Sequence, residues 1–179
     1  MGYAGGTTAN PTYHDLGGAA ETVQLDFDPS QVSYEELVEK FFSFHDATFA
    51  PSTGQYRSVI FVNGADQEQI ARSVTQRVQA DSKGTIQTQI VTVGDFHLAE
   101  DYHQKYLLQM DGLLFSEFHA MYPTFADLVD STAAMRVNSY LDGYGTADQV
   151  RAELSGLGLS DAAQQRLLAV SPAGACPVQ

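Results

Sequence analysis

The chain begins with a glycine-rich stretch that leads into a short alternating segment, and this stretch limits the fold more than any other. Residues 2–18 contain five glycines together with the turn signal Asn10-Pro11. Glycines at such density indicate backbone conformations with positive φ or close backbone approach, so we predict a loop here. The segment Glu21–Phe27 then alternates between polar and apolar residues, which is typical of a β-strand.

Glu21 is the unusual residue of this predicted strand. The alternation places its carboxylate on the same face as Val23, Leu25 and Phe27. Burial on an apolar face would disfavour the charged form and raise the pKa of the carboxyl group, which could then hold and deliver a proton near neutral pH. The alternative is a glutamate at the end of a strand that turns back to solvent, and position alone favours neither.

A helix is predicted directly after this strand. Ser33 and Glu36 have the spacing of a capping box. The residues that follow form an apolar stripe at helical spacing: Tyr34, Leu37, Val38, Phe41 and Phe42. His45 continues this face, and we expect a structural, hydrogen-bonded histidine there rather than a ligand.

The later segments first alternate between strand and helix and then become wholly helical. We predict strands at 56–62 and 85–93, a helix at 66–80, and a helix from 99 onward that carries His103 and Tyr106 on one face. After residue 110 the strand patterns stop, and three residues each have the character of a helix N-cap: Thr124, Thr146 and Ser160.

This order predicts an α/β (α+β) two-layer domain over residues 1–110 and a helical extension over residues 111–179. We expect the end of the extension to be a mobile tail that carries Cys176. Because this is the one cysteine of the chain, an internal disulfide framework is excluded.

Charge excludes two classes of partner. The net charge is −13, so the chain has no basic surface for nucleic acid or for anionic membranes. No apolar run is long enough to span a membrane, and no signal-peptide pattern is present, so we expect a cytoplasmic protein.

The common catalytic motifs are missing from the sequence. It has no P-loop, dinucleotide fingerprint, serine elbow or zinc spacing, so we expect no cofactor and no metal. What remains is a set of polar aromatic and acidic residues: Tyr3, Tyr13, Tyr56, Tyr102, Glu21 and His103. Such tyrosines are usually half-buried packing residues, but beside a buried acid they could donate hydrogen bonds to a ligand oxygen.

Several motifs, in their order along the chain, resemble peptide methionine sulfoxide reductase A. The resemblance spans residues 2 to 108, and its runs include Gly2-Tyr3-Ala4-Gly5-Gly6, Asn10-Pro11-Thr12-Tyr13, Gly18-Ala19-Ala20-Glu21, Gln55-Tyr56-Arg57-Ser58 and Ala99-Glu100-Asp101-Tyr102-His103. Residues 138–159 are similar to the helical C-terminal extension of one branch of that family. The family fold is a two-layer α/β sandwich with a mixed sheet and flanking helices.

The resemblance implies an oxidoreductase that repairs oxidised proteins under oxidative stress. Such enzymes reduce the S epimer of methionine sulfoxide, free or in proteins. A thiolate attacks the sulfur and becomes a sulfenic acid, and a resolving cysteine then forms a disulfide that thioredoxin or another dithiol reduces. By motif, Glu21 is the acid, Tyr13 and Tyr56 donate hydrogen bonds to the sulfoxide oxygen, His103 contacts the substrate, and Cys176 is the resolving cysteine.

The family's Gly-Cys-Phe-Trp-Gly motif, which carries the nucleophile, is missing from this sequence. It normally lies upstream of the first glycine run, so we expect Met1 not to be the true start and the first strand and helix of the family fold to be absent. The chain as given is then inactive. Two alternatives stay open: a non-catalytic module that binds methionine sulfoxide, and a plain structural or interaction domain.

Overall fold

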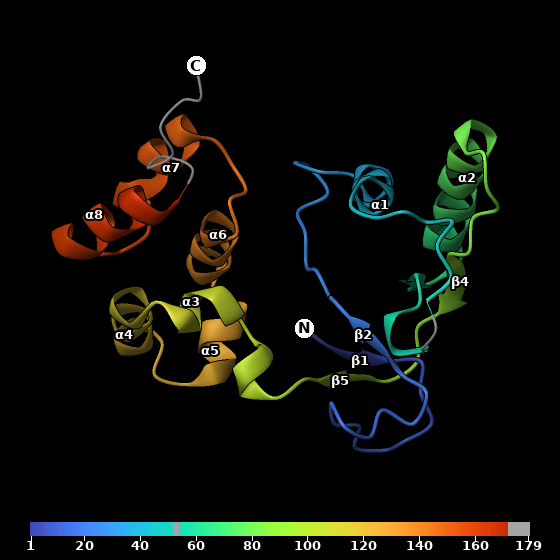
Figure 1. The fold of residues 1–179 in the computed structure, drawn as a ribbon, viewed down its shortest axis with the longest axis horizontal. Coiled ribbons are helices and arrows are strands. Elements are labelled where there is room, and N and C mark those ends of the chain that lie inside the picture. Colours follow the sequence, from blue (N-terminus) through green and yellow to red (C-terminus); the bar gives the residue numbers. More distant parts are fainter. Residues whose placement is uncertain (52–53, 172–179) are drawn as a thin grey trace. The chain divides into compact units, whose positions relative to one another are not determined.

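The computed structural model describes residues 1–51 and 54–171. It divides into two compact units, Met1–Glu100 and Asp101–Gln179, which are described separately below (Figure 1). The first unit contains all the described strands, and the second is helical. The mixed helix and strand content agrees with the predicted α/β (α+β) class.

The first unit contains an antiparallel three-stranded sheet. Strand β1 (Gly2–Ala4) pairs on one side with β2 (Ala20–Thr22) and on the other with β5 (Phe96–Leu98). In this register Tyr3 lies opposite Glu21 on one strand and opposite His97 on the other. The sheet therefore joins three segments that are far apart in the sequence.

The prediction of a loop over residues 2–18 is wrong for its first three residues, because β1 occupies them. The glycine at position 2 allows the close approach of the neighbouring strand. A Cβ atom on Gly2 would lie 2.3 Å from the carbonyl oxygen of His97 and 2.4 Å from the ring of Phe96. The next glycines do belong to a loop, where Gly17 has a φ of 53°.

The predicted strand over residues 21–27 is also too long. Pairing with β1 ends at Thr22, because β1 itself has only three residues. Beyond that point Val23 is 68% exposed and Leu25 is 56% exposed, so the predicted apolar face is not a core face.

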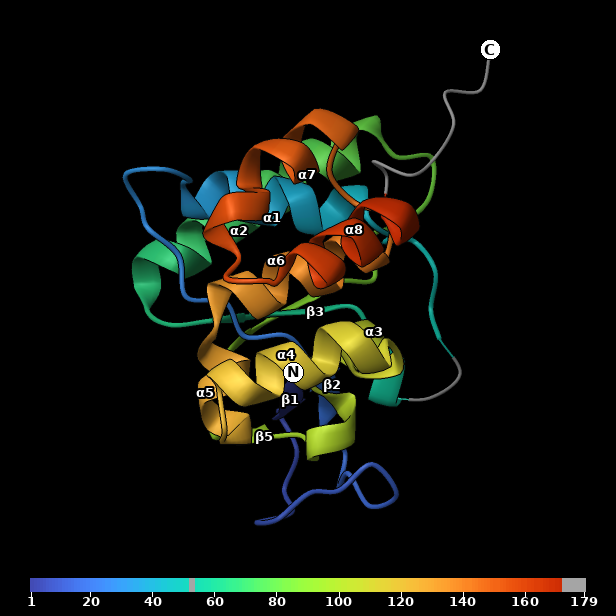
Figure 2. The same ribbon diagram turned by 90° about the vertical axis from the view of Figure 1, so that its left-hand side faces the viewer.

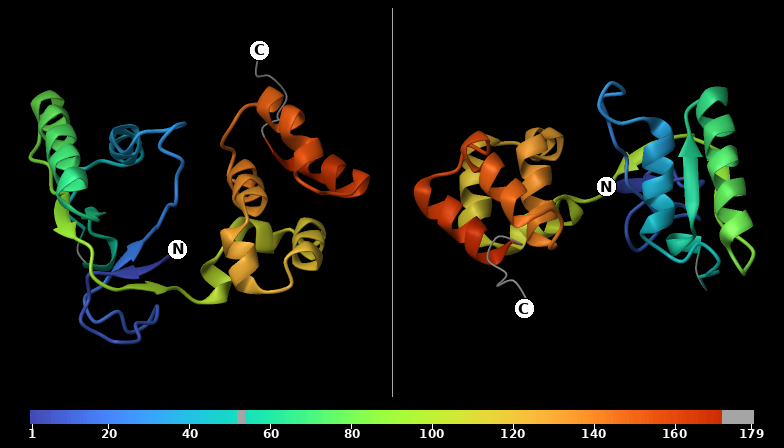
Figure 3. Two further views of the ribbon diagram at one scale, coloured as in Figure 1. Left: turned by 180° about the vertical axis from the view of Figure 1, so that it is seen from behind. Right: turned by 90° about the horizontal axis from the view of Figure 1, so that it is seen from above.

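A second layer of the first unit consists of a parallel strand pair and two helices. Strand β3 (Val59–Val62) pairs with β4 (Gln89–Thr92), and α2 (Ala65–Asp81) connects them. Helix α1 (Tyr34–Ser43) packs against α2 (Figure 3). Both strands are shorter than the predicted segments, and the described strands of the first unit form two small sheets, one antiparallel and one parallel.

Helix α1 confirms the capping box. The Ser33 side chain accepts a hydrogen bond from the Glu36 backbone, and the Glu36 side chain accepts one from the Ser33 backbone. Val38 and Phe42 of the apolar stripe are buried in the core of this layer. His45 hydrogen-bonds through Nδ1 with the Phe41 carbonyl oxygen at 3.0 Å and through Nε2 with the Ser58 hydroxyl at 2.9 Å, as expected of a structural histidine.

The second unit begins where a single helix is predicted, but that helix is broken. The 3₁₀ helix η2 (Asp101–His103) precedes α3 (Tyr106–Met110), and Lys105 between them has a φ of 48°. This left-handed residue interrupts the helical spacing, so His103 and Tyr106 do not lie on one helical face.

The rest of the second unit is a bundle of short helices (Figure 2). These are α4 (Gly112–Met121), α5 (Phe125–Asp130), α6 (Thr132–Leu141), α7 (Ala147–Glu153), η3 (Leu154–Gly156) and α8 (Asp161–Val170). The N-caps Thr124, Thr146 and Ser160 are confirmed by their side-chain hydrogen bonds. Asp111 and Ser131 are further N-caps.

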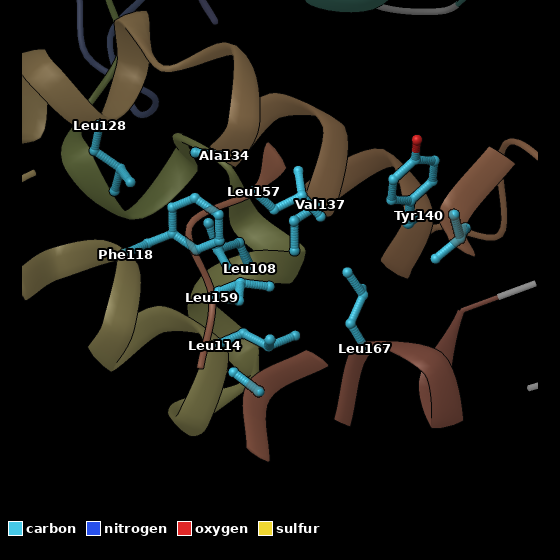
Figure 4. Packing of buried hydrophobic residues seen from close by; sticks show 12 residues of the cluster. Leu108, Leu114, Phe118, Leu128, Ala134, Val137, Tyr140, Leu157, Leu159 and Leu167 are labelled. Atoms are coloured by element: carbon cyan, nitrogen blue, oxygen red, sulfur yellow. The ribbon is translucent and has the colours of Figure 1, made fainter. Parts of the chain in front are cut away.

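A compact apolar core holds these helices together, and Figure 4 shows its side chains converging from successive helices. Leu108, Leu114, Phe118 and Leu167 are among its fully buried members. At the edge of the core, the carboxylate of Asp111 accepts a hydrogen bond from Arg166 Nε at 2.7 Å. No described helix in either unit is long and apolar enough to cross a membrane.

Candidate active site

Glu21 lies in β2 and is partly buried. Its Oε1 atom accepts a hydrogen bond from the Gln55 side-chain amide at 2.6 Å. Since Val23 and Leu25 are exposed, this acid is not part of a buried apolar face. Its position is set instead by pairing with the central strand and by the Gln55 amide.

Tyr13 and Tyr56 meet beside this acid. Their hydroxyl oxygens are 3.4 Å apart, although the residues are 43 positions apart in the sequence. Tyr56 ends the 3₁₀ helix η1 (Gly54–Tyr56), which lies against β2. The hydrogen bond with Tyr13 is the main reason that the pKa of Tyr56 is raised, and partial burial and the nearby charges of Tyr13 and Glu21 add to it.

Arg57 fastens this 3₁₀ helix to the glycine-rich loop. Its Nη1 atom donates to the carbonyl oxygens of Gly18 at 2.9 Å and Gly54 at 2.8 Å. Its Nη2 atom donates to the Gly5 carbonyl oxygen at 3.4 Å. The guanidinium group thus ties the segment of Tyr56 to both ends of the loop that carries Tyr13.

Glu100 supports the loop from the other side. Its Oε2 atom accepts a hydrogen bond from the hydroxyl of Tyr3 at 2.6 Å, and its Oε1 atom accepts one from the backbone N–H of Tyr13 at 3.1 Å. Tyr3 is fully buried in the central strand. The side chain of Glu100 therefore links the sheet to the Tyr13 loop.

Sequence reasoning missed the roles of Gln55, Arg57 and Glu100. All three lie inside runs that carry the family resemblance, directly beside or near the residues that were assigned a role. That proximity was the available signal. The sequence does not reveal which distant residue each of these side chains contacts, because the fold determines that partner.

The structure brings together three of the predicted site residues, Tyr13, Glu21 and Tyr56, within the first unit. His103 belongs to the second unit, where it is partly buried and its ring centroid lies 4.2 Å from that of Tyr102. Cys176 lies outside the described residues. Within the part of the chain that the structure describes, no group of three histidine, cysteine or acidic side chains is placed to hold a metal ion.

This arrangement suits the binding of a polar oxygen. Two phenol groups converge on one point, and a carboxyl group lies beside them. Hydroxyl donors fixed in this way stabilise an oxygen on which negative charge develops, and the carboxyl group is a candidate proton donor. The described side chains can therefore bind and protonate the oxygen of an S–O or C–O bond.

Three comparisons with known proteins bear on this site. The family described as peptide methionine sulfoxide reductase matches residues 1–124. The chain is 34% identical to the peptide methionine sulfoxide reductase of Drosophila melanogaster over 92% of its own length and 67% of the relative. It is 38% identical to peptide methionine sulfoxide reductase A5 of Oryza sativa over 78% of its own length, and spans 57% of that protein.

A solved structure is also similar. The chain matches Mxr1 from Saccharomyces cerevisiae in reduced form with a TM-score of 0.56 and 28% sequence identity, over 60% of this chain and 68% of that one. The matched family covers every residue of the first unit, including the tyrosine pair and Glu21. The chain belongs to the peptide methionine sulfoxide reductase family.

Proposed function

We propose that the protein reduces the S epimer of methionine sulfoxide to methionine, with free or protein-bound methionine sulfoxide as substrate. The first unit binds and protonates the sulfoxide oxygen. The observation that carries this proposal is the pair of hydroxyl groups of Tyr13 and Tyr56, 3.4 Å apart, together with Glu21, which accepts a hydrogen bond from Gln55, the residue directly before Tyr56. A sulfoxide oxygen carries partial negative charge and accepts two hydrogen bonds, so it matches this pair of donors.

In the proposed reaction a thiolate attacks the sulfoxide sulfur while the oxygen takes a proton from Glu21. The sulfur–oxygen bond of the substrate breaks, the oxygen passes to the attacking thiol, and the products are methionine and a sulfenic acid. A second thiol condenses with the sulfenic acid, which releases water and forms a disulfide. A dithiol reductant then reduces that disulfide and is itself oxidised.

Further parts of the proposal rest on the family resemblance. They are thioredoxin as the reductant, Cys176 as the resolving thiol and His103 as a substrate-binding residue. The attacking thiol is the one that the family carries in its Gly-Cys-Phe-Trp-Gly motif. Glu21, Tyr13 and Tyr56 supply only the oxygen side of the chemistry.

Two measurements test this function. The first is an NMR titration of the chain with the S and R epimers of methionine sulfoxide, and we expect tighter binding of the S epimer. The second is dithiothreitol-dependent reduction by the chain, alone and with the Gly-Cys-Phe-Trp-Gly motif and its natural spacing placed before residue 1. We expect turnover when the motif is present.

The outcomes separate the possible functions. If neither form of the chain binds or reduces the sulfoxide, the proposal is overturned and a structural or interaction domain remains. Binding of the S epimer without turnover in either form would instead support a non-catalytic binding module.

A further inference from the structure

Glu100 joins two parts of the first unit through its two carboxylate oxygens. Oε2 accepts from the Tyr3 hydroxyl at 2.6 Å, and Oε1 accepts from the backbone N–H of Tyr13 at 3.1 Å. These partners lie 97 and 87 positions away in the sequence. A carboxylate that accepts a hydrogen bond on each oxygen has a fixed orientation and forms stronger bonds than a neutral acceptor.

One end of this bridge is rigid. Tyr3 is fully buried, and its backbone pairs with Glu21 on one side and with His97 on the other. The backbone is also fixed at Ala99, the residue before Glu100, because its N–H donates to the Met1 carbonyl oxygen at 3.1 Å. Glu100 thus projects from a fixed backbone toward a fixed hydroxyl group.

The other end of the bridge is the loop that carries Tyr13, which has backbone hydrogen bonds of its own. Thr12 and Asp15 exchange backbone hydrogen bonds of 3.0 Å around Tyr13, and the Thr7 N–H donates to the Gly17 carbonyl oxygen at 3.0 Å. These bonds set the shape of the loop, and Arg57 holds its two ends through the Gly5 and Gly18 carbonyl oxygens. Tyr13 and Leu16 pack against the buried cluster around Tyr3, and the bond from Tyr13 to Glu100 adds a directional contact.

We propose that Glu100 is a positioning residue, which holds the Tyr13 loop against the central strand so that the Tyr13 hydroxyl meets the Tyr56 hydroxyl. Glu100 itself touches neither the substrate nor the reacting atoms. Its contribution to the proposed reduction is to place one of the two donors before the sulfoxide oxygen arrives. This consequence rests on the proposed function, whereas the positioning of Tyr13 does not.

The test measures, in the full chain, whether the hydrogen bond between Tyr13 and Tyr56 is present. The pKa of Tyr56 is measured by NMR titration of tyrosines labelled at ¹³Cζ, with its signal assigned from the Tyr56→Phe variant. The hydrogen bond with Tyr13 is the main cause that raises this pKa. The Tyr56 pKa measured in Tyr13→Phe is therefore the reference value for a Tyr56 that has lost its hydrogen bond with Tyr13.

Three variants distinguish the effect of the two hydrogen bonds of Glu100 from the effect of its negative charge. Glu100→Ala removes both acceptors, and we expect the Tyr56 pKa to fall toward the value in Tyr13→Phe. Glu100→Gln removes the same charge, but its amide oxygen can accept from the Tyr13 N–H while its amide nitrogen donates to the Tyr3 hydroxyl oxygen, so we expect a pKa close to that of the wild type. Tyr3→Phe removes one half of the bridge and should give an intermediate value.

Two results would overturn the proposal. One is a wild-type Tyr56 pKa in Glu100→Ala with native circular dichroism. The other is an equal fall in Glu100→Ala and Glu100→Gln, because the charge of Glu100 rather than its bridge would then explain the change. If Glu100→Ala does not fold, Tyr3→Phe decides, and an unchanged Tyr56 pKa in that variant overturns the positioning role.

The functional consequence has its own measurement. We expect Glu100→Ala to weaken the affinity for the S epimer of methionine sulfoxide several-fold more than Glu100→Gln does. Should the wild-type chain bind no sulfoxide at all, the proposed function fails, while the Tyr56 titration still tests Glu100. A lowered Tyr56 pKa in Glu100→Ala without any change in affinity would support the positioning of Tyr13 and overturn its consequence for binding.

Discussion

The side-chain amide of Gln55 donates a hydrogen bond of 2.6 Å to Oε1 of Glu21, which joins the acid on β2 to the residue that directly precedes Tyr56. One oxygen of the carboxyl group is therefore occupied by a donor, and a proton to be delivered to the substrate would reside on Oε2. Because Gln55 and Tyr56 are neighbours in η1, one short segment orients the acid and supplies a phenol group.

The first prediction concerns proton delivery by Glu21. Glu21→Gln keeps the shape and can still bond to Gln55, but its amide is not an acid. We expect turnover to fall by about 10²–10⁴-fold, the usual contribution of a general acid, while affinity for the sulfoxide changes little. The measurement is single-turnover reduction of the S epimer by the chain that carries the Gly-Cys-Phe-Trp-Gly motif.

A matched control is Glu35→Gln on the surface of α1. Glu35 pairs with Arg77 at 2.6 Å, but Arg77 also pairs with Glu39 at 2.8 Å, so the cation keeps a partner. We expect this variant to behave as the wild type. Full turnover in Glu21→Gln would show that the proton comes from another group.

The second prediction concerns the two phenol groups. Tyr13→Phe and Tyr56→Phe each remove one hydrogen bond to the sulfoxide oxygen, which is worth about 1 kcal/mol, so each should weaken binding by about five- to tenfold. Because the hydroxyl oxygens are 3.4 Å apart, we expect the double variant to lose less than the sum of the two single losses.

Calorimetric titration with the S epimer checks the tyrosine pair, with Tyr106→Phe as the control, since Tyr106 is 55% exposed and belongs to the second unit. Additive losses in the double variant would mean that the two hydroxyl groups do not act on one oxygen atom.

A structural feature can be predicted from the sequence when the residues that determine it lie close together along the chain. The capping box at Ser33 and Glu36 and the N-caps at Thr124 and Thr146 depend on residues within one helical turn, and the sequence alone locates them. Strand β1 depends on partners from residues 20–22 and 96–98. No local pattern in a glycine-rich stretch reveals such partners.

The same distinction applies to the candidate site. The family motifs indicate Tyr13, Glu21 and Tyr56, and the fold places them together. The role of Glu100 depends on a bond to Tyr3 that spans 97 positions, so residue type and spacing could not reveal it. Alternation in residues 21–27 was misleading, because amphipathic spacing indicates a strand only where a partner strand exists to pair with it.

The third prediction concerns Asp111 in the second unit. Its Oδ1 atom caps α4 through the Leu114 N–H, and its Oδ2 atom accepts from Arg166. The Asp111 side chain is 9% exposed. Asp111→Asn loses the charge and turns an amide toward Arg166, so we expect a loss of about 1–3 kcal/mol in the free energy of unfolding.

Asp148→Asn provides the comparison for an exposed ion pair. Asp148 pairs with Arg151 at 3.3 Å, and its side chain is 99% exposed. Urea unfolding followed by circular dichroism should show little effect of this change, because solvent screens such pairs. Equal losses in the two variants would contradict the importance of burial at Asp111.

The last prediction concerns Tyr34, whose hydroxyl is buried and has no hydrogen-bond partner among the described residues. Burial raises the pKa of Tyr34 above its ordinary value of 10.0, so the folded protein holds this proton more tightly than the unfolded chain. The resulting contribution to stability is fully present below about pH 10 and is lost as the pH rises through the folded-state pKa. Tyr34→Phe should remove this alkaline loss.

The same variant should also raise the free energy of unfolding at neutral pH by up to about 1 kcal/mol, because it removes a buried polar atom that lacks a partner while keeping the ring. Urea unfolding at neutral pH and at a pH above the ordinary tyrosine pKa checks both effects, with Tyr106→Phe as the exposed control. A destabilised Tyr34→Phe would mean that the hydroxyl has a partner, such as an ordered water, that offsets its burial.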